Sequence, residues 1–167
     1  MPGEIKKTLR RALAITAVII LLAPETAEAG RVPASYEKDG FRPLCLIDPE
    51  SDRFYRKFIR VGRGAGPLEL MRAFFAERGA FFIPEGVNVY GAELEGETLY
   101  INVSPEILYF RGSYAETRMA AQIIKTALEP GGGAKRVTLL IDGELRPLAE
   151  GTLIANAGDM WYDIPGD

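Results

Sequence analysis

The chain has 167 residues, of which 20 are basic and 23 are acidic, and its formal net charge is −3. It contains no histidine, which excludes histidine zinc sites and Ser-His or Cys-His nucleophile pairs. The mildly acidic balance, without a dense run of Lys and Arg, argues against nucleic acid as a partner. The single cysteine, Cys45, permits no intramolecular disulfide, so the fold has to rely on packing.

The first 29 residues have the three parts of a signal peptide. Basic residues up to Arg11 precede an apolar run over residues 12–23, and Ala27 and Ala29 place small residues at a cleavage position. A helix that spans a bilayer needs about 20 apolar residues, so this run is short. We predict export with cleavage after Ala29; the alternative is an uncleaved segment that stays as a short membrane anchor. No cysteine lies near the cleavage position, which argues against a lipid anchor.

Two strands are predicted after a linker over residues 30–40. The first covers residues 41–48 and has Pro43 near its start, where an edge strand tolerates a missing amide donor. Residues 49–52, PESD, form a turn. The second strand, around residues 54–62, alternates imperfectly between apolar and charged side chains, which indicates an edge or half-exposed strand.

A glycine-rich joint, GRGAGP, leads into the first predicted helix over residues 67–78. The joint lacks the Lys-Ser/Thr of a phosphate-binding loop, and we interpret it as a strand-to-helix connection, with anion binding at the helix start as the alternative. Gly79 is the expected end of the helix. The connection after it carries three apolar residues, for which we favour packing into the core over a partner-facing patch: Phe81, Phe82 and Ile83.

A hairpin over residues 87–103, with its turn at Glu95-Gly96, precedes the second helix. Ser113 stands three residues before Glu116, the spacing of a capping box in which serine caps the helix and glutamate reaches back to the cap. The apolar residues that follow, up to Leu128, recur at i, i+3, i+4 and i+7. This spacing predicts one buried apolar stripe that packs on a sheet.

The last predicted strand begins at Arg136 and ends at an Asp142-Gly143 hairpin turn, after which residues 146–154 return beside it. The resulting order, strands and helices in a duplicated β-β-α pattern, predicts the α+β class. We expect a single small domain over residues 41–154, with a mixed or antiparallel sheet and two helices packed on one face. Residues 155–167 form a C-terminal tail.

The sequence resembles a known family in four segments that occur in the same order. These are LYINVSPEIL, a Gly-Ser helix start, AAQIIKTAL and RVTLLIDGE. Together they resemble the GerMN domain, found in sporulation and spore-germination proteins of the GerM type and in some bacterial lipoproteins. The resemblance implies a non-catalytic, extracytoplasmic α+β domain that works through protein contacts, similar to ring-building modules of sporulation complexes. Ser113 and Glu116 match the family's helix start and Asp142-Gly143 its final hairpin, and all four look structural.

We therefore predict an exported interaction or assembly module, with no catalytic residue, cofactor or metal site. Its partners are expected to be proteins of the cell envelope or further copies of itself, with membrane contact only through an uncleaved N-terminal segment. The alternative is a cell-envelope protein that binds peptidoglycan by stacking sugars on Tyr36, Tyr90, Tyr100, Tyr109 and Trp161. A carboxylate hydrolase would rest on Asp48, Glu50 and Asp52, which a solvated turn explains better.

The predicted interaction surface combines the second strand with the connection after the first helix. It consists of Arg56, Arg60, Phe81, Phe82 and Ile83. Edge strands are natural docking sites for another chain, and charged residues normally guard them. Because exposed charges contribute little to stability, reversing Arg56 and Arg60 is expected to weaken association and leave the melting temperature unchanged.

Overall fold

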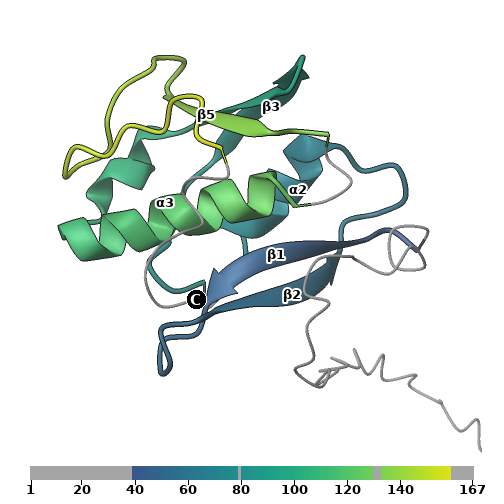
Figure 1. Cartoon of the computed structure of the whole chain (residues 1–167), viewed down its shortest axis with the longest axis horizontal. Helices are drawn as coiled ribbons and strands as arrows, with labels where there is room; N and C mark the ends of the chain where they lie inside the picture. Colours follow the sequence, from purple (N-terminus) through teal and green to yellow (C-terminus); the bar gives the residue numbers. More distant parts are fainter. Residues whose placement is uncertain (1–38, 79, 130–132, 159–167) are drawn as a thin grey trace, which may run out of the picture. The chain divides into compact units, whose positions relative to one another are not determined.

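The computed structural model describes residues 39–78, 80–129 and 133–158; the export segment, the linker up to residue 38 and the end of the tail lie outside this part. The described elements, in chain order, are β1 (Phe41–Ile47), β2 (Phe54–Arg60), α2 (Pro67–Phe75), β3 (Val89–Glu95), β4 (Thr98–Val103), the 3-10 helix η1 (Pro105–Tyr109), α3 (Ser113–Ala127) and β5 (Arg136–Ile141). Figure 1 shows their arrangement.

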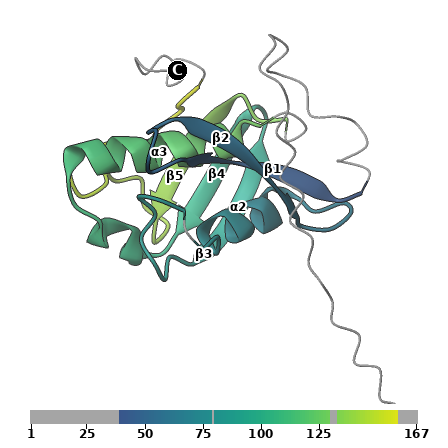
Figure 2. The same cartoon turned by 90° about the horizontal axis from the view of Figure 1, so that it is seen from below.

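The strands form two sheets, with the helices between them. β1 and β2 pair antiparallel, and a second sheet has the order β3-β4-β5, in which β3 is antiparallel and β5 parallel to β4. In Figure 1 the β1-β2 hairpin lies below α2 and α3 while β3 and β5 lie above them, and Figure 2 shows the same elements from below. The α+β class and the duplicated β-β-α order are confirmed, although the strands are divided between two sheets.

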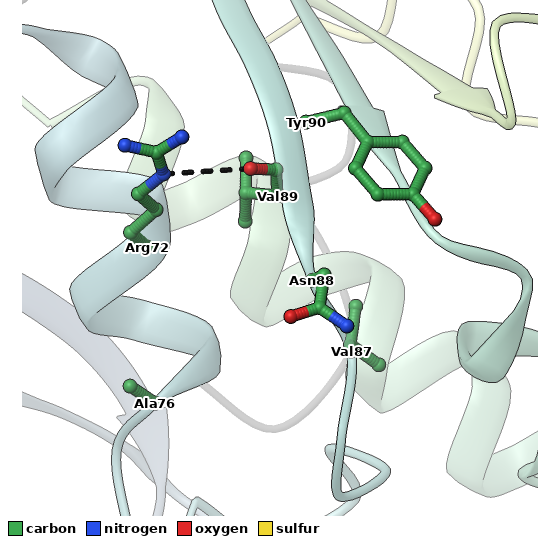
Figure 3. Close-up of a pocket in the computed structure, with 6 residues that line it drawn as sticks. All are labelled: Arg72, Ala76, Val87, Asn88, Val89 and Tyr90. Carbon is green, nitrogen blue, oxygen red and sulfur yellow. Dashed lines mark hydrogen bonds between the residues drawn. The ribbon is translucent and has the colours of Figure 1, made fainter.

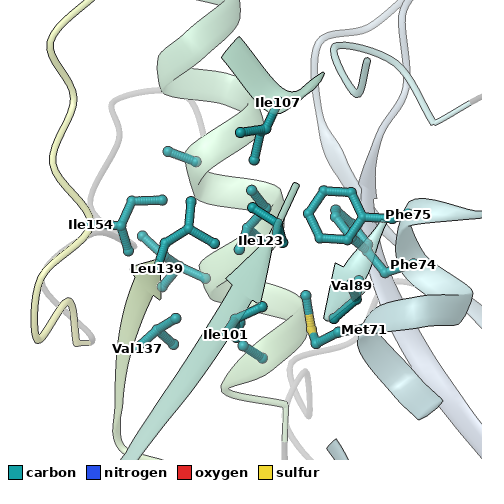
Figure 4. Close-up of a cluster of buried hydrophobic side chains, with 14 of the residues drawn as sticks. Met71, Phe74, Phe75, Val89, Ile101, Ile107, Ile123, Val137, Leu139 and Ile154 are labelled. Atoms are coloured by element: carbon teal, nitrogen blue, oxygen red, sulfur yellow. The ribbon is translucent and has the colours of Figure 1, made fainter. Parts of the chain in front are cut away.

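The hydrophobic core fills the space between the three-stranded sheet and the two helices (Figure 4). Met71 and Phe74 of α2 and Ile123 of α3 are fully buried there, against Ile101 and Leu139 of the sheet. This packing follows from the apolar spacing of the helices and from the inward residues of β4 and β5. α2 ends at Phe75, before the expected end at residue 78.

The segment after β5 departs from the predicted strand. Asp142 and Gly143 form the expected turn, with φ angles of 53° and 81°, and Ile141 donates its N–H to Glu144 at 2.9 Å. Residues 146–154 do not return as a strand. Instead, Leu139 donates to the carbonyl of Ile154, and Val137 pairs with a residue of the predicted tail, Ala157.

The capping box predicted at the start of α3 is wrong. Gly112 occupies the cap position, Ser113 is the first helical residue, and no side chain caps the helix. Glu116 is completely buried, and its two carboxylate oxygens accept the backbone N–H groups of Glu150 at 2.6 Å and Thr152 at 2.8 Å. The loop after β5 supplies these two donors, and bonding to them outcompetes a contact with the helix's own cap.

The contact is reciprocal, because Glu150 accepts the N–H of Gly112 at 3.0 Å and places a carboxylate at the helix start. A glutamate that reaches back to a cap occurs in α2 instead, where Glu69 accepts the N–H of Gly66 at 2.9 Å. The turn of the β3-β4 hairpin lies at Gly96-Glu97, one position later than predicted.

A second stripe on α3, made of polar side chains, faces β1. The Thr126 hydroxyl accepts the N–H of Cys45 at 2.9 Å, and the Gln122 amide oxygen accepts the N–H of Ile47 at 3.0 Å. Both Thr126 and Gln122 are completely buried. The expected apolar stripe is confirmed, but it is only one of two buried stripes: α3 packs its apolar stripe on one sheet and completes the edge of the other with hydrogen bonds.

We predict that Glu116→Ala lowers the free energy of unfolding by about 3 kcal/mol, because two backbone N–H groups lose their acceptor. Ser113→Ala is the matched control on the same turn and should change it by less than about 0.5 kcal/mol. Denaturant unfolding of both variants measures the difference. An equal loss in the two variants would restore the capping-box interpretation.

Candidate interaction surface

Four aromatic side chains gather at the N-terminal end of α3. The Phe81 and Phe82 rings lie 4.2 Å apart, and Phe82 meets the rings of Phe110 and Tyr114 edge-on at 6.1 and 5.8 Å. We call Phe81, Phe82, Phe110 and Tyr114 the aromatic surface. Phe81 is 43% and Tyr114 58% exposed. An exposed cluster of large apolar side chains marks a candidate binding site.

The backbone of this surface is strained at one residue. Phe82 has a φ of 65°, in the left-handed region that bulky residues rarely adopt, at a cost of about 1–3 kcal/mol. The amide of Gln122 donates to the Phe81 carbonyl at 2.7 Å and holds the connection against α3. Phe82 and Ile83 pack against the core while Phe81 is exposed. The connection therefore packs two of its apolar side chains into the core and leaves the third exposed on the surface.

A charged cluster ties the β1-β2 turn to the aromatic surface. Tyr114 and Arg118 both donate hydrogen bonds to one carboxylate oxygen of Asp52, and Arg118 also donates to the Tyr114 hydroxyl at 3.2 Å. The Arg118 side chain is 9% exposed, and its guanidinium lies 5.5 Å from the centre of the Phe54 ring. The turn, the start of β2 and α3 are thereby fixed relative to one another.

Two acidic residues of the turn, Asp48 and Asp52, have structural partners. Asp48 accepts the N–H groups of Glu50 at 2.8 Å and Ser51 at 3.2 Å, as expected for an aspartate that opens a turn. Asp52 is bound by Arg118. These contacts of Asp48 and Asp52 support the turn interpretation over the hydrolase alternative.

The two arginines of β2 differ in their surroundings. Arg56 binds Glu129 at 2.8 Å, and the Glu129 side chain is only 6% exposed. Reversing Arg56 would place a second carboxylate beside this buried one, so for Arg56 we now expect a lower melting temperature rather than an unchanged one. Arg60 is exposed and has no ion pair in the described part of the chain. Reversing Arg60 therefore tests its role in association without the loss of an ion pair.

The predicted surface residues lie at both ends of β2. Gln122 bonds both Ile47 and Phe81, which places the aromatic connection beside the turn end of the hairpin. Arg60 is at the other end of β2, about 20 Å away along the strand. Among the described residues no strand pairs with the outer edge of β2.

A shallow cleft of about 530 Å³ lies between α2 and the start of β3. Arg72 reaches from α2 to the Val89 carbonyl at 3.4 Å, while the Tyr90 ring points to the far side of the strand (Figure 3). The lining holds no pair of carboxylates and no nucleophile with a neighbouring base. Across the described residues, no group of three or more Cys, Asp or Glu side chains is placed to hold a metal ion.

The tyrosines of the peptidoglycan alternative are spread over several elements. Tyr90 on β3 and Tyr109 at the end of η1 are 52% and 74% exposed, and Tyr100 on β4 is half-buried. Tyr36 and Trp161 lie outside the described residues.

Sequence reasoning missed three residues of the site: Tyr114, Arg118 and Phe110. Tyr114 and Arg118 are four residues apart, a spacing that places two side chains together on a helix and was the available signal. Nothing in the sequence indicated that Phe110 meets Phe82, because that contact joins segments that only the fold brings together.

Two β-β-α units, packed as two sheets around two helices with an exposed aromatic surface, define a small α+β domain without a recognisable catalytic constellation among its described residues. The chain matches the Germane family, described as sporulation and spore germination, over residues 44–146. It therefore belongs to this family. No curated protein is a match to the chain.

Three solved structures share the fold. The first GerMN domain of the sporulation protein GerM from Bacillus subtilis superposes with a TM-score of 0.58 at 17% identity, covering 72% of this chain and 98% of that domain. The tandem GerMN domains of the same protein give 0.55 at 16% identity, covering 70% of this chain and 44% of theirs. A protein described as a lipoprotein from Clostridium perfringens gives 0.51 at 17% identity, with 72% and 89% covered.

The carboxyl group of Asp52 provides a pH-dependent test of the charged cluster. The hydrogen bond from Tyr114, followed by that from Arg118, holds the pKa of Asp52 below its usual value. A carboxylate with a lowered pKa stabilises the fold above its unfolded pKa, and this stabilisation is lost as the pH falls through the folded pKa. We expect Asp52→Asn to lower the melting temperature at neutral pH, and the difference from wild type to shrink below about pH 4.

Asp142→Asn is the matched control, since Asp142 also has a positive φ, and it is exposed. Its melting temperature at neutral pH should stay close to that of the wild type. A wild-type advantage over Asp52→Asn that persists undiminished at about pH 2–3 would contradict the ionic role of Asp52.

Proposed function

We propose that this protein is a non-catalytic, exported module of the cell envelope that works through protein contacts in sporulation or spore germination. Membership of the Germane family supports the process, and the fold shared with GerM and with a protein described as a lipoprotein supports the location. The observation that carries the interaction role is the aromatic surface, which exposes Phe81 and Tyr114 around a strained Phe82.

The strain argues for a use of the surface beyond folding. A left-handed Phe82 costs stability, and exposure of the Phe81 ring gives up the burial that would offset the cost. Aromatic residues and arginine are enriched among the residues that contribute most to binding at protein interfaces. We propose that the docking surface comprises β2 together with the connection over Phe81, Phe82 and Ile83, and that Arg56 supports it through Glu129 while Arg60 faces the partner.

Peptidoglycan binding is the second candidate, because exposed aromatic rings also stack on sugars. The exposure of Tyr109 and Tyr90 favours it. The two candidates differ in the partner: a protein partner forms a complex of defined mass, whereas peptidoglycan is a large, insoluble polymer. The experiment on the docking surface uses this difference.

The proposed export can be tested by determining the N-terminal residue of the mature protein. No helix among the described residues is long and apolar enough to cross a membrane. We propose that the signal segment is removed after Ala29, so N-terminal sequencing of the protein from the envelope or the medium should start at Gly30. An intact terminus at Met1 or Pro2 on membrane-bound protein would support the uncleaved anchor instead.

The docking surface is tested by crosslinking in the cell. A photo-reactive phenylalanine analogue at Phe81 should yield adducts of discrete mass with another protein, because the exposed ring is part of the proposed contact. Leu145, 53% exposed and beyond the Asp142-Gly143 turn, is the matched control position and should yield none. Arg60→Glu should reduce the adducts from position 81 without lowering the melting temperature.

Adducts that sediment only with purified peptidoglycan would favour the second candidate. Equal adducts from positions 81 and 145 would remove the special role of the aromatic surface.

A further inference from the structure

Opposite charges are segregated between two strands of the domain. Residues 53–63, which contain β2, carry five basic side chains and no acidic one: Arg53, Arg56, Lys57, Arg60 and Arg63. Residues 85–97, which contain β3, carry four acidic side chains and no basic one: Glu85, Glu93, Glu95 and Glu97. The two segments therefore present surfaces of opposite sign.

Part of this charge is neutralised inside the domain. Four of the nine side chains have ion-pair partners there: Arg56 with Glu129, Lys57 with Glu77, Arg63 with Asp39 and Glu97 with Lys135. Within the described residues, five exposed charges are left without an ion-pair partner: Arg53, Arg60, Glu85, Glu93 and Glu95. The charge that remains is basic around β2 and acidic around β3.

The two strands lie on opposite sides of the helices. β2 belongs to the hairpin below α2 and α3 in Figure 1, and β3 to the sheet above them. Each is the last strand of its sheet among the described residues. A basic and an acidic strand on opposite sides cannot meet within one molecule, but they can meet between two.

Both strands also expose large apolar side chains. Tyr55 on β2 is 44% exposed, and Tyr90 and Leu94 on β3 are 52% and 40% exposed. An interface commonly combines an apolar centre with charged residues around it, and complementary charge sets which surfaces meet. The exposed charges of β2 and β3 are opposite in sign, and both strands expose apolar side chains, so the surface of one strand complements the surface of the other.

We propose that the partner of β2 is a second copy of this chain, which presents its β3, so that copies associate head to tail. This inference rests on the proposed function and specifies the occupant of the same surface. Arg60 of one copy lies against Glu93 and Glu95 of the next, with Tyr55 against Tyr90 and Leu94. Because the two surfaces differ, every added copy leaves one of each exposed, and the assembly closes as a ring or grows as a filament.

Charge exchange between two variants tests the proposal. The purified wild-type protein should self-associate in a concentration-dependent way, and more weakly as ionic strength rises. Arg60→Glu and Glu93→Arg should each weaken self-association about tenfold or more, since attraction becomes repulsion. An equimolar mixture of the two variants should associate again, because the two substituted side chains then meet with opposite charges and the second contact between the variants is the wild-type one. Sedimentation velocity over a concentration series measures all four samples.

Control variants carry the same charge changes at exposed positions outside the two strands. Arg78→Glu and Glu144→Arg should leave self-association unchanged. A wild-type protein that stays monomeric at every concentration, or a mixture that does not associate, overturns the inference. If adducts from position 81 with a different protein persist in that case, the proposed function stands and only the identity of the partner is wrong.

Discussion

The fold depends on hydrogen bonds from α3 to the edge of β1. A two-stranded sheet leaves the outer amides of β1 without a strand partner, and an unpaired buried amide costs about 1–3 kcal/mol. Thr126 and Gln122 accept two of these N–H groups, from Cys45 and Ile47. The helix therefore takes the place of a third strand and fixes the hairpin to the rest of the domain.

The same helix positions the candidate interaction surface. Gln122 bonds Ile47 with its amide oxygen and Phe81 with its amide nitrogen, so the hairpin and the aromatic connection are set by one side chain. One turn earlier, Arg118 bonds Asp52 and Tyr114. Because these side chains are buried and bonded on both sides, the exposed rings are held in place, and we propose that this lowers the entropic cost of binding a partner.

Much of the architecture was predictable from local patterns in the sequence. Apolar spacing predicted both helices, alternation and turn residues predicted β1 to β5, and the Asp142-Gly143 turn formed where expected. The imperfect alternation of β2 correctly indicated an edge strand. These features depend on neighbours in the sequence, so the sequence determined them without knowledge of the fold.

Tertiary structure decided the roles of polar side chains, because a hydrogen bond depends on which groups the fold brings within about 3 Å. Ser113 and Glu116 had the spacing of a capping box, yet Glu116 bonds a loop more than thirty residues away. Arg56 looked like a surface charge, yet it neutralises the buried Glu129. The sequence by itself determined the elements and their apolar faces; the packing of the hairpin on α3 decided which polar residues stabilise the fold and which remain exposed.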